Sequence, residues 1–153
     1  MLSARLIQMI EDHAEELMGG LIGKLKTHPR TSAYTRFSDS EIHDRLYTVY
    51  KDLGAWMLGK PEEEIRRHYE ALGLRRYQEG IPLFEVLYAG TLSKSHLLDY
   101  IRNNGLAGTV LEIYAEQELT HKINQFFDNA IYFTAKGYQQ AAAGSAGQAS
   151  GPR

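Results

Sequence analysis

Two basic side chains fall on apolar helix faces, where a lone charge is unfavourable. Lys94 lies in the middle of the apolar face of one helical segment, and Arg76 lies within the apolar face of the segment before it. Because an unpaired cation is costly to bury, each side chain either extends its charge to solvent or pairs with a carboxylate such as Glu112 or Glu116. The alternative is functional: Lys94, Arg76 and His68 together form an internal pocket for a small anion.

Two other patterns suggest metal or heme chemistry. Glu118 and His121 have the Glu-x-x-His spacing of helical di-iron sites, but such sites need a second copy, which the sequence lacks. A lone pair at this spacing favours a surface hydrogen bond. His96 is the natural candidate for an axial heme ligand, yet a helical wheel places it beside Glu85, away from the apolar face of its segment. We therefore predict no metal and no cofactor, with heme as the open alternative.

The composition excludes several classes of function. There is no cysteine, which excludes disulfides, thiolate metal sites and thiol nucleophiles. No Gly-rich phosphate loop, nucleophile elbow or HExxH motif occurs, so we predict no enzyme. A formal net charge of -2 offers no basic stripe for nucleic acid. No apolar run is long enough to span a membrane, and no signal peptide is recognisable, so the default prediction is a cytoplasmic bacterial-type protein.

The hydrophobic spacing predicts an all-α protein. Apolar residues recur at intervals of three and four in five segments, which we expect to be helices at about 4–26, 38–58, 61–79, 82–102 and 106–138. The last thirteen residues, 141–153, contain no large apolar side chain and are predicted to form a flexible tail. The chain should therefore comprise one domain, 1–140, followed by this tail.

Local signals mark the helix ends. Ser38 and Glu41 have the spacing of a capping box at a helix start. Gly80 can adopt the left-handed conformation that ends a helix, and Ile81 can fold back as the apolar partner of a Schellman-type cap. Pro82 then starts the next helix. Because a residue before proline favours extended geometry, we expect the two helices to meet at a sharp angle.

The last helix has more apolar surface than one packing seam requires. One stripe contains Leu119, Ile123, Phe126, Ala130 and Phe133, and a second lies roughly 100° around the helix. Either this helix is surrounded by its own domain, or two chains form a dimeric four-helix bundle from their first and last helices. The dimer hypothesis assigns seven residues to the interface: Phe127, Ile131, Thr134, Tyr138, Leu6, Ile10 and Leu17.

The segment "LGLRRYQEGIPLFEVLYAGTLSKSHLLDYI", residues 72–101, resembles a known signature. Its Leu-Gly-x-x-Arg, Gly-hydrophobic-Pro-Leu and Glu-Val-Leu elements, with a basic residue further along, are similar to the N-terminal domain of RsbR-type stressosome regulators, the RsbT co-antagonist N-terminal family. The resemblance extends over roughly residues 4–138, and its most specific part is this segment.

The resemblance implies a globin-like, dimeric, non-heme domain with a sensory or regulatory role. Members of that family act as input domains for a phosphorylatable STAS domain or a histidine kinase. We therefore expect a non-catalytic domain that dimerises and passes a signal to a kinase or stressosome-type partner. A heme- or small-molecule-binding sensor or carrier is the alternative.

Overall fold

Every secondary-structure element that the structure describes is a helix. The computed structural model describes residues 2–104 and 110–149. In chain order the elements are α1 (Leu2–Asp12), α2 (Ala14–Thr27), the 3₁₀ helix η1 (Pro29–Arg36), α3 (Asp39–Met57), α4 (Glu62–Gln78), α5 (Leu83–Asn104) and α6 (Val110–Ala149). The all-α prediction is confirmed.

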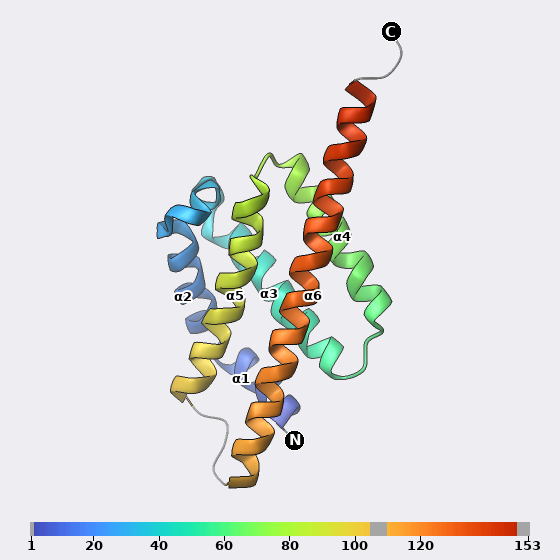
Figure 1. The fold of residues 1–153 in the computed structure, drawn as a ribbon. Helices are drawn as coiled ribbons and strands as arrows, with labels where there is room; N and C mark the ends of the chain where they lie inside the picture. Colours follow the sequence, from blue (N-terminus) through green and yellow to red (C-terminus); the bar gives the residue numbers. More distant parts are fainter. Residues whose placement is uncertain (1, 105–109, 150–153) are drawn as a thin grey trace.

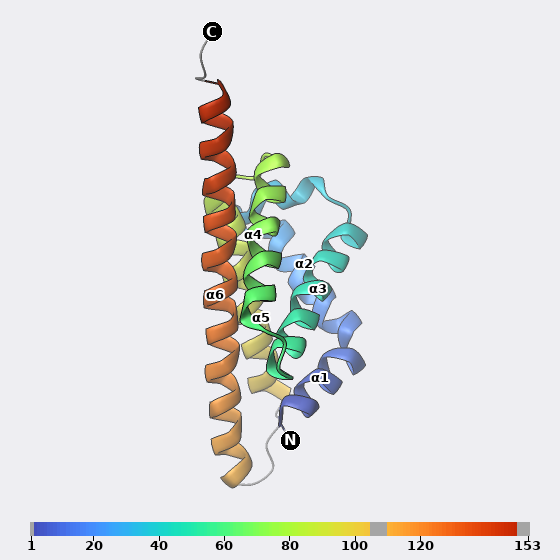
Figure 2. The ribbon, with the colours of Figure 1, turned by 90° about the vertical axis from the view of Figure 1, so that its right-hand side faces the viewer.

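The longest helix, α6, runs along one side of the molecule. Figure 1 shows it crossing in front of α3, with α5 on one side and α4 on the other. In Figure 2 the other helices all lie to one side of α6, and its C-terminal end extends past them. The core lies between α6 and these helices and is formed by aliphatic and aromatic side chains, of which Tyr50, Phe126 and Phe127 are the largest fully buried ones.

The first predicted helix is two helices. The chain bends at His13, whose backbone angles are φ −118° and ψ 23°. Hydrogen bonding continues across the bend, since His13 N–H donates to Met9 and its carbonyl accepts from Leu17 N–H. The bend lets α1 pack on α3 and α6 while α2 packs on η1, α3 and α5. The following segment, which lies between two of the predicted helices, forms η1.

Both predicted helix ends are confirmed in detail. Ser38 and Glu41 make the reciprocal bonds of a capping box at the start of α3. After α4, Gly80 has φ 73° and its N–H donates to Tyr77, while Ile81 N–H donates to the Arg76 carbonyl. These two bonds are those of a Schellman motif. Ile81 is completely buried, which fixes the direction in which α5 leaves the joint.

Helices α4 and α6 pack with their backbones in contact. A Cβ atom at Gly137 would lie 2.0 Å from the Glu70 carbonyl oxygen, and one at Gly73 would lie 2.1 Å from the Thr134 carbonyl oxygen. Only glycine permits this approach, so these two residues determine how closely α6 lies on the rest of the molecule. The hydroxyl of Tyr138 adds a hydrogen bond to the Ile81 carbonyl at 2.6 Å, which ties α6 to the α4–α5 joint.

Helix α6 continues beyond the predicted domain end at residue 140. It extends to Ala149, so most of the segment 141–153 that was predicted to be a flexible tail is helical. The physical reason is that alanine and glutamine favour the helix and can extend one that is already nucleated. Residues 150–153 lie outside the described part of the chain.

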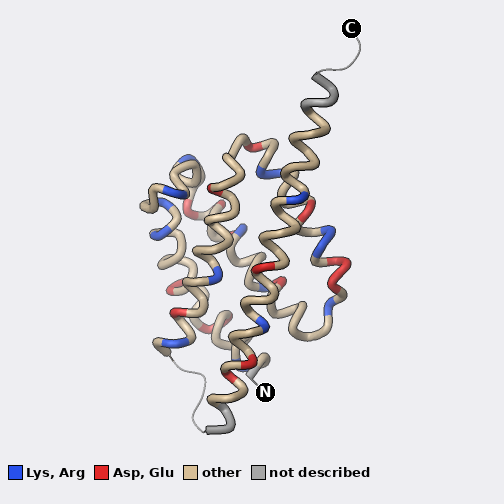
Figure 3. Tube along the Cα trace, in the orientation of Figure 1, with Lys and Arg blue, Asp and Glu red and all other residues tan. Residues whose placement is uncertain are grey.

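Charges of both signs are spread over the helices, as Figure 3 shows. No charged residue occurs between Lys136 and the end of α6. Within the described residues, no helix is both long and apolar enough to cross a membrane.

Candidate functional site

A cavity of about 80 Å³ lies between α3, α4, α5 and α6. The space exists because the facing positions carry small side chains, which are Ala89 and Ser93 on α5 and Ala130 and Thr134 on α6. The Ser93 hydroxyl donates to the Ala89 carbonyl at 2.8 Å, and the Thr134 hydroxyl donates to the Ala130 carbonyl at 2.7 Å. Each hydroxyl is thus bound to its own helix, and this side of the cavity is effectively apolar. Further apolar side chains complete the wall, among them Leu46, Val49, Leu72, Val86, Leu87, Phe127 and Ile131.

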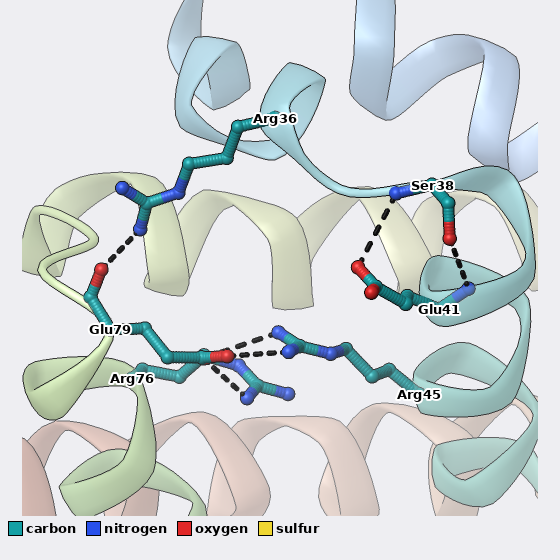
Figure 4. A network of polar contacts seen from close by, with 6 residues as sticks. All are labelled: Arg36, Ser38, Glu41, Arg45, Arg76 and Glu79. Carbon is teal, nitrogen blue, oxygen red and sulfur yellow. Dashed lines mark hydrogen bonds and ion pairs between the residues drawn. The ribbon is translucent and has the colours of Figure 1, made fainter.

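The other side of the cavity is basic. Tyr34, Arg45 and Arg76 contribute to its lining, and the Arg76 side chain is only 9% exposed. The Nη1 atom of Arg76 donates to Glu79 Oε1 at 2.9 Å, and Nη1 of Arg45 donates to the same oxygen at 3.2 Å. Arg45 also contacts the second Glu79 oxygen, and Arg36 donates to the Glu79 backbone carbonyl (Figure 4). Two arginines therefore share the Glu79 carboxylate, and a third binds the backbone carbonyl of the same residue.

The four ionisable groups of this cluster influence one another. Burial lowers the pKa of Arg76, and the nearby charge of Arg45 acts in the same direction, against the opposing effects of Tyr34 and Glu79. Burial raises the pKa of Tyr34, while the two arginines act to lower it. Partial burial acts to raise the pKa of Glu79, but its hydrogen bonds and charge interactions with Arg45 and Arg76 outweigh burial and lower it. At neutral pH the arginines and Glu79 are charged and Tyr34 is not.

The start of α3 and the end of α4 position the arginines and Glu79 of this cluster. Arg76 lies in the last turn of α4, where its own carbonyl accepts the Schellman bond, and Glu79 caps the same helix. Arg45 comes from the first half of α3 and lies with its guanidinium 4.4 Å from the centre of the Phe37 ring. The capping box that begins α3 and the Gly80 joint that ends α4 therefore set where the basic groups meet.

The three residues predicted to hold an anion do not form one pocket. Arg76 lies at the cavity, and His68 lies in an adjoining groove between α3 and α4 that Arg76 also lines. His68 Nδ1 is 3.1 Å from an oxygen of Asp52, to which the Tyr69 hydroxyl also donates at 3.0 Å. Lys94 lies apart from both and pairs with Asp128 of α6 at 3.3 Å rather than with Glu116, and the Glu112 side chain lies outside the described part of the chain.

The residues assigned to a dimer interface lie largely inside the single chain. Five of the seven are buried there: Leu6, Ile10, Leu17, Phe127 and Thr134. Ile131 contributes to the cavity wall, and Tyr138 bonds to the α4–α5 joint. The two stripes of the last helix are both covered by the same chain because α6 is flanked by α4 and α5 and also contacts α1 and α3. Only Ile131 and Tyr138 remain partly exposed, so these seven side chains leave little surface for a second copy.

Arg45, Tyr34 and Glu79 were missed by reasoning from the sequence. Arg45 could have been found, because it lies three residues after Ile42 and four before Val49, on the apolar face of its helix. Tyr34 and Glu79 carry no such signal, since Tyr34 lies outside the five predicted helices and Glu79 lies at a helix end.

The remaining chemical candidates lie elsewhere. His96 is on α5, and its Nε2 lies 2.9 Å from the Leu17 carbonyl oxygen. Glu118 and His121 are exposed on α6. Within the described residues, no histidine lines the cavity, and no three acidic or histidine side chains are grouped as metal ligands.

Comparison with known proteins yields no relative: no family model, characterised protein or solved structure matches this chain.

Proposed function

We propose that this chain is a non-catalytic regulatory domain that binds a small molecule in the cavity and transmits the occupancy of the cavity through α6. The observation that carries the proposal is the composition of the cavity wall. Phe127, Ala130, Ile131 and Thr134 of α6 all line it, and the same helix continues for fifteen residues beyond Thr134 to Ala149. A ligand in this cavity contacts the helix that extends past the rest of the molecule.

The packing of α6 supports a response to such contact. Gly137 and Tyr138 hold the helix against α4 and against the α4–α5 joint, one turn after the cavity. A ligand shifts a conformational equilibrium only if it binds the two states with different affinity. A ligand that pushes on Ala130 and Thr134 should bind the two positions of α6 with different affinity. The reason is that the backbone contact of Gly137 with α4 cannot adapt unless α6 moves.

The resemblance to RsbR-type regulators supports a signalling output. On this basis the proposal includes a globin-like fold, a homodimer and a kinase or STAS-type partner in the cytoplasm. Since the chain buries most of the residues first assigned to the dimer, we place the contact on the outer face of α6. Tyr114 and Tyr132 are 66% and 61% exposed there, and a spacing of eighteen residues places them on one face.

Native mass spectrometry combined with hydrogen–deuterium exchange tests the proposal. Protein purified gently from its own host should carry a small molecule, and removing this molecule should change amide exchange in residues 141–149. Ser93→Leu fills the cavity, whereas Ser95→Leu makes the same change on the exposed side of α5. We expect Ser93→Leu to lose the ligand and Ser95→Leu to retain it, with both variants folded by circular dichroism. Equal retention by the two variants, or exchange in α6 that ignores the ligand, contradicts the proposal.

A further inference from the structure

The basic side of the cavity carries more positive charge than its neighbours neutralise. Arg45 and Arg76 share the single carboxylate of Glu79, and Arg36 binds only the Glu79 backbone carbonyl within this network (Figure 4). Arg45 and Arg76 line the cavity, whereas Glu79 lines the outer groove. Among the described residues, the cavity side of the pair therefore lacks an anion of its own.

Because this excess charge is largely buried, its free energy is unfavourable unless an anion binds nearby. The Arg76 side chain is 9% exposed, and a guanidinium that is removed from water is stabilised by an anionic partner. A planar carboxylate matches a guanidinium because it can accept two parallel hydrogen bonds. A second carboxylate beside Arg45 and Arg76 would give each arginine one negative charge.

The rest of the cavity selects the remainder of the ligand. The hydroxyls of Ser93 and Thr134 donate to backbone carbonyls of their own helices. The wall between α5 and α6 therefore offers an apolar surface that suits an aliphatic group. The volume of about 80 Å³ limits the size of this group. An apolar cavity of roughly 150 Å³ accommodates benzene, so only a few carbon atoms fit here.

We infer that the cavity binds a short aliphatic monocarboxylate, with its carboxylate on Arg76 and Arg45 and its alkyl group between α5 and α6. This inference rests on the proposed function and names the ligand class of the same site. An inorganic anion satisfies the arginines and leaves the apolar wall empty, and a neutral molecule of equal size does the reverse. Only a carboxylate with an alkyl group both pairs with the arginines and covers the apolar wall.

Isothermal titration calorimetry with sodium butyrate tests this inference, in a buffer free of other carboxylates. Butyramide and inorganic phosphate serve as the neutral and inorganic probes. Butyrate should bind at least roughly tenfold more tightly than butyramide, because a hydrogen bond to a charged group contributes that much to affinity. It should also bind at least roughly tenfold more tightly than phosphate, because only butyrate buries an alkyl group against the apolar wall. Affinity along the series from acetate to octanoate should peak at about four or five carbons, since the cavity volume sets the limit.

Two matched variants locate the carboxylate. Arg76→Met should weaken butyrate binding at least roughly tenfold. Arg67→Met makes the same change on α4 at a side chain that is 69% exposed and lines neither the cavity nor the groove, and it should leave the affinity unchanged. If Arg76→Met does not fold, the chain-length series and the butyramide comparison on the unmodified protein decide alone. The inference is overturned if butyramide or phosphate binds as tightly as butyrate. It is also overturned if Arg76→Met and Arg67→Met lose the same affinity for butyrate.

The same data separate the ligand class from the sensing role. If butyramide binds as well as butyrate and still changes exchange in α6, the ligand class is wrong and the sensing function stands. If butyrate binds through Arg76 without altering α6, the ligand class stands and the sensing function is wrong.

Discussion

Replacing Gly137 by alanine is the sharpest test of how α6 is held. A Cβ atom at this position would lie 2.0 Å from the Glu70 carbonyl oxygen and 2.7 Å from the Glu70 carbonyl carbon, whereas real Cβ contacts essentially never fall below 3.0 Å. The two helices must therefore separate locally by about 1 Å. Both sides of the contact are backbone, so no change of rotamer can relieve the clash.

The expected magnitude combines two opposing effects. Overpacking of this kind destabilises by about 1–3 kcal/mol, and the absence of a yielding side chain places this case at the upper end or beyond. Alanine gains roughly 1 kcal/mol over glycine in helix propensity. The net loss should be about 2 kcal/mol, which lowers the melting temperature of a chain of this size by roughly 4–8 °C.

Gly23→Ala provides the matched control. Gly23 lies inside α2 on the exposed side, and nothing lies within 4 Å of a Cβ placed there. The same substitution should therefore stabilise the protein by up to about 1 kcal/mol. Thermal and urea unfolding followed by circular dichroism measure both variants. A Gly137→Ala protein that melts at or above the temperature of the unmodified chain would refute the close approach of α4 and α6.

Three further predictions concern single side chains. Burial lowers the pKa of His96, the charge of Lys24 adds to this effect, and the hydrogen bond to a backbone carbonyl opposes it. Because the unfolded chain then takes up a proton near pH 6.5 that the folded protein resists, stability should fall as the pH drops through about 6.5. His96→Gln should reduce this loss, as measured by urea midpoints at neutral and mildly acidic pH. Although partial burial acts to raise the pKa of Glu79, the two arginines lower it overall, so its stabilising contribution is present above the ordinary carboxyl pKa and is lost as the pH falls through the lowered value. Glu79→Gln should cost about 1–3 kcal/mol at neutral pH, with a difference from the unmodified protein that shrinks in acid; a constant difference would contradict the assignment. Tyr138→Phe removes the 2.6 Å hydrogen bond to Ile81 and should destabilise by about 0.5–1.5 kcal/mol in chemical unfolding, and no loss would mean that this bond does not hold α6.

Features that depend on neighbours in sequence were predictable. The capping box at Ser38 and the Schellman motif at Gly80 require only four and six consecutive residues, and both form as expected. The same is true of Arg76, whose spacing placed it on an apolar face and whose side chain is buried. In these cases the local backbone determines the outcome, so residue types and spacing suffice.

Features that depend on how helices cross were not predictable in the same way. The apolar stripes of the last helix indicate that it must be covered, yet they do not distinguish a partner chain from the same chain. A carboxylate partner was one of the alternatives for Lys94, but only the packing of α5 on α6 selects Asp128. Gly73 and Gly137 read as weak points of two helices, and their role becomes visible only when the helices are in contact.

The firm attachment of α6 near Tyr138 gives the remainder of that helix mechanical leverage. From Tyr138 to Ala149 the helix rises by roughly 16 Å. A tilt of about 5° around the Gly137 contact moves the far end by roughly 1.5 Å over this rise, while the atoms at the pivot scarcely move. Under the proposed function, the protruding part of α6 would therefore move further than the residues at its attachment.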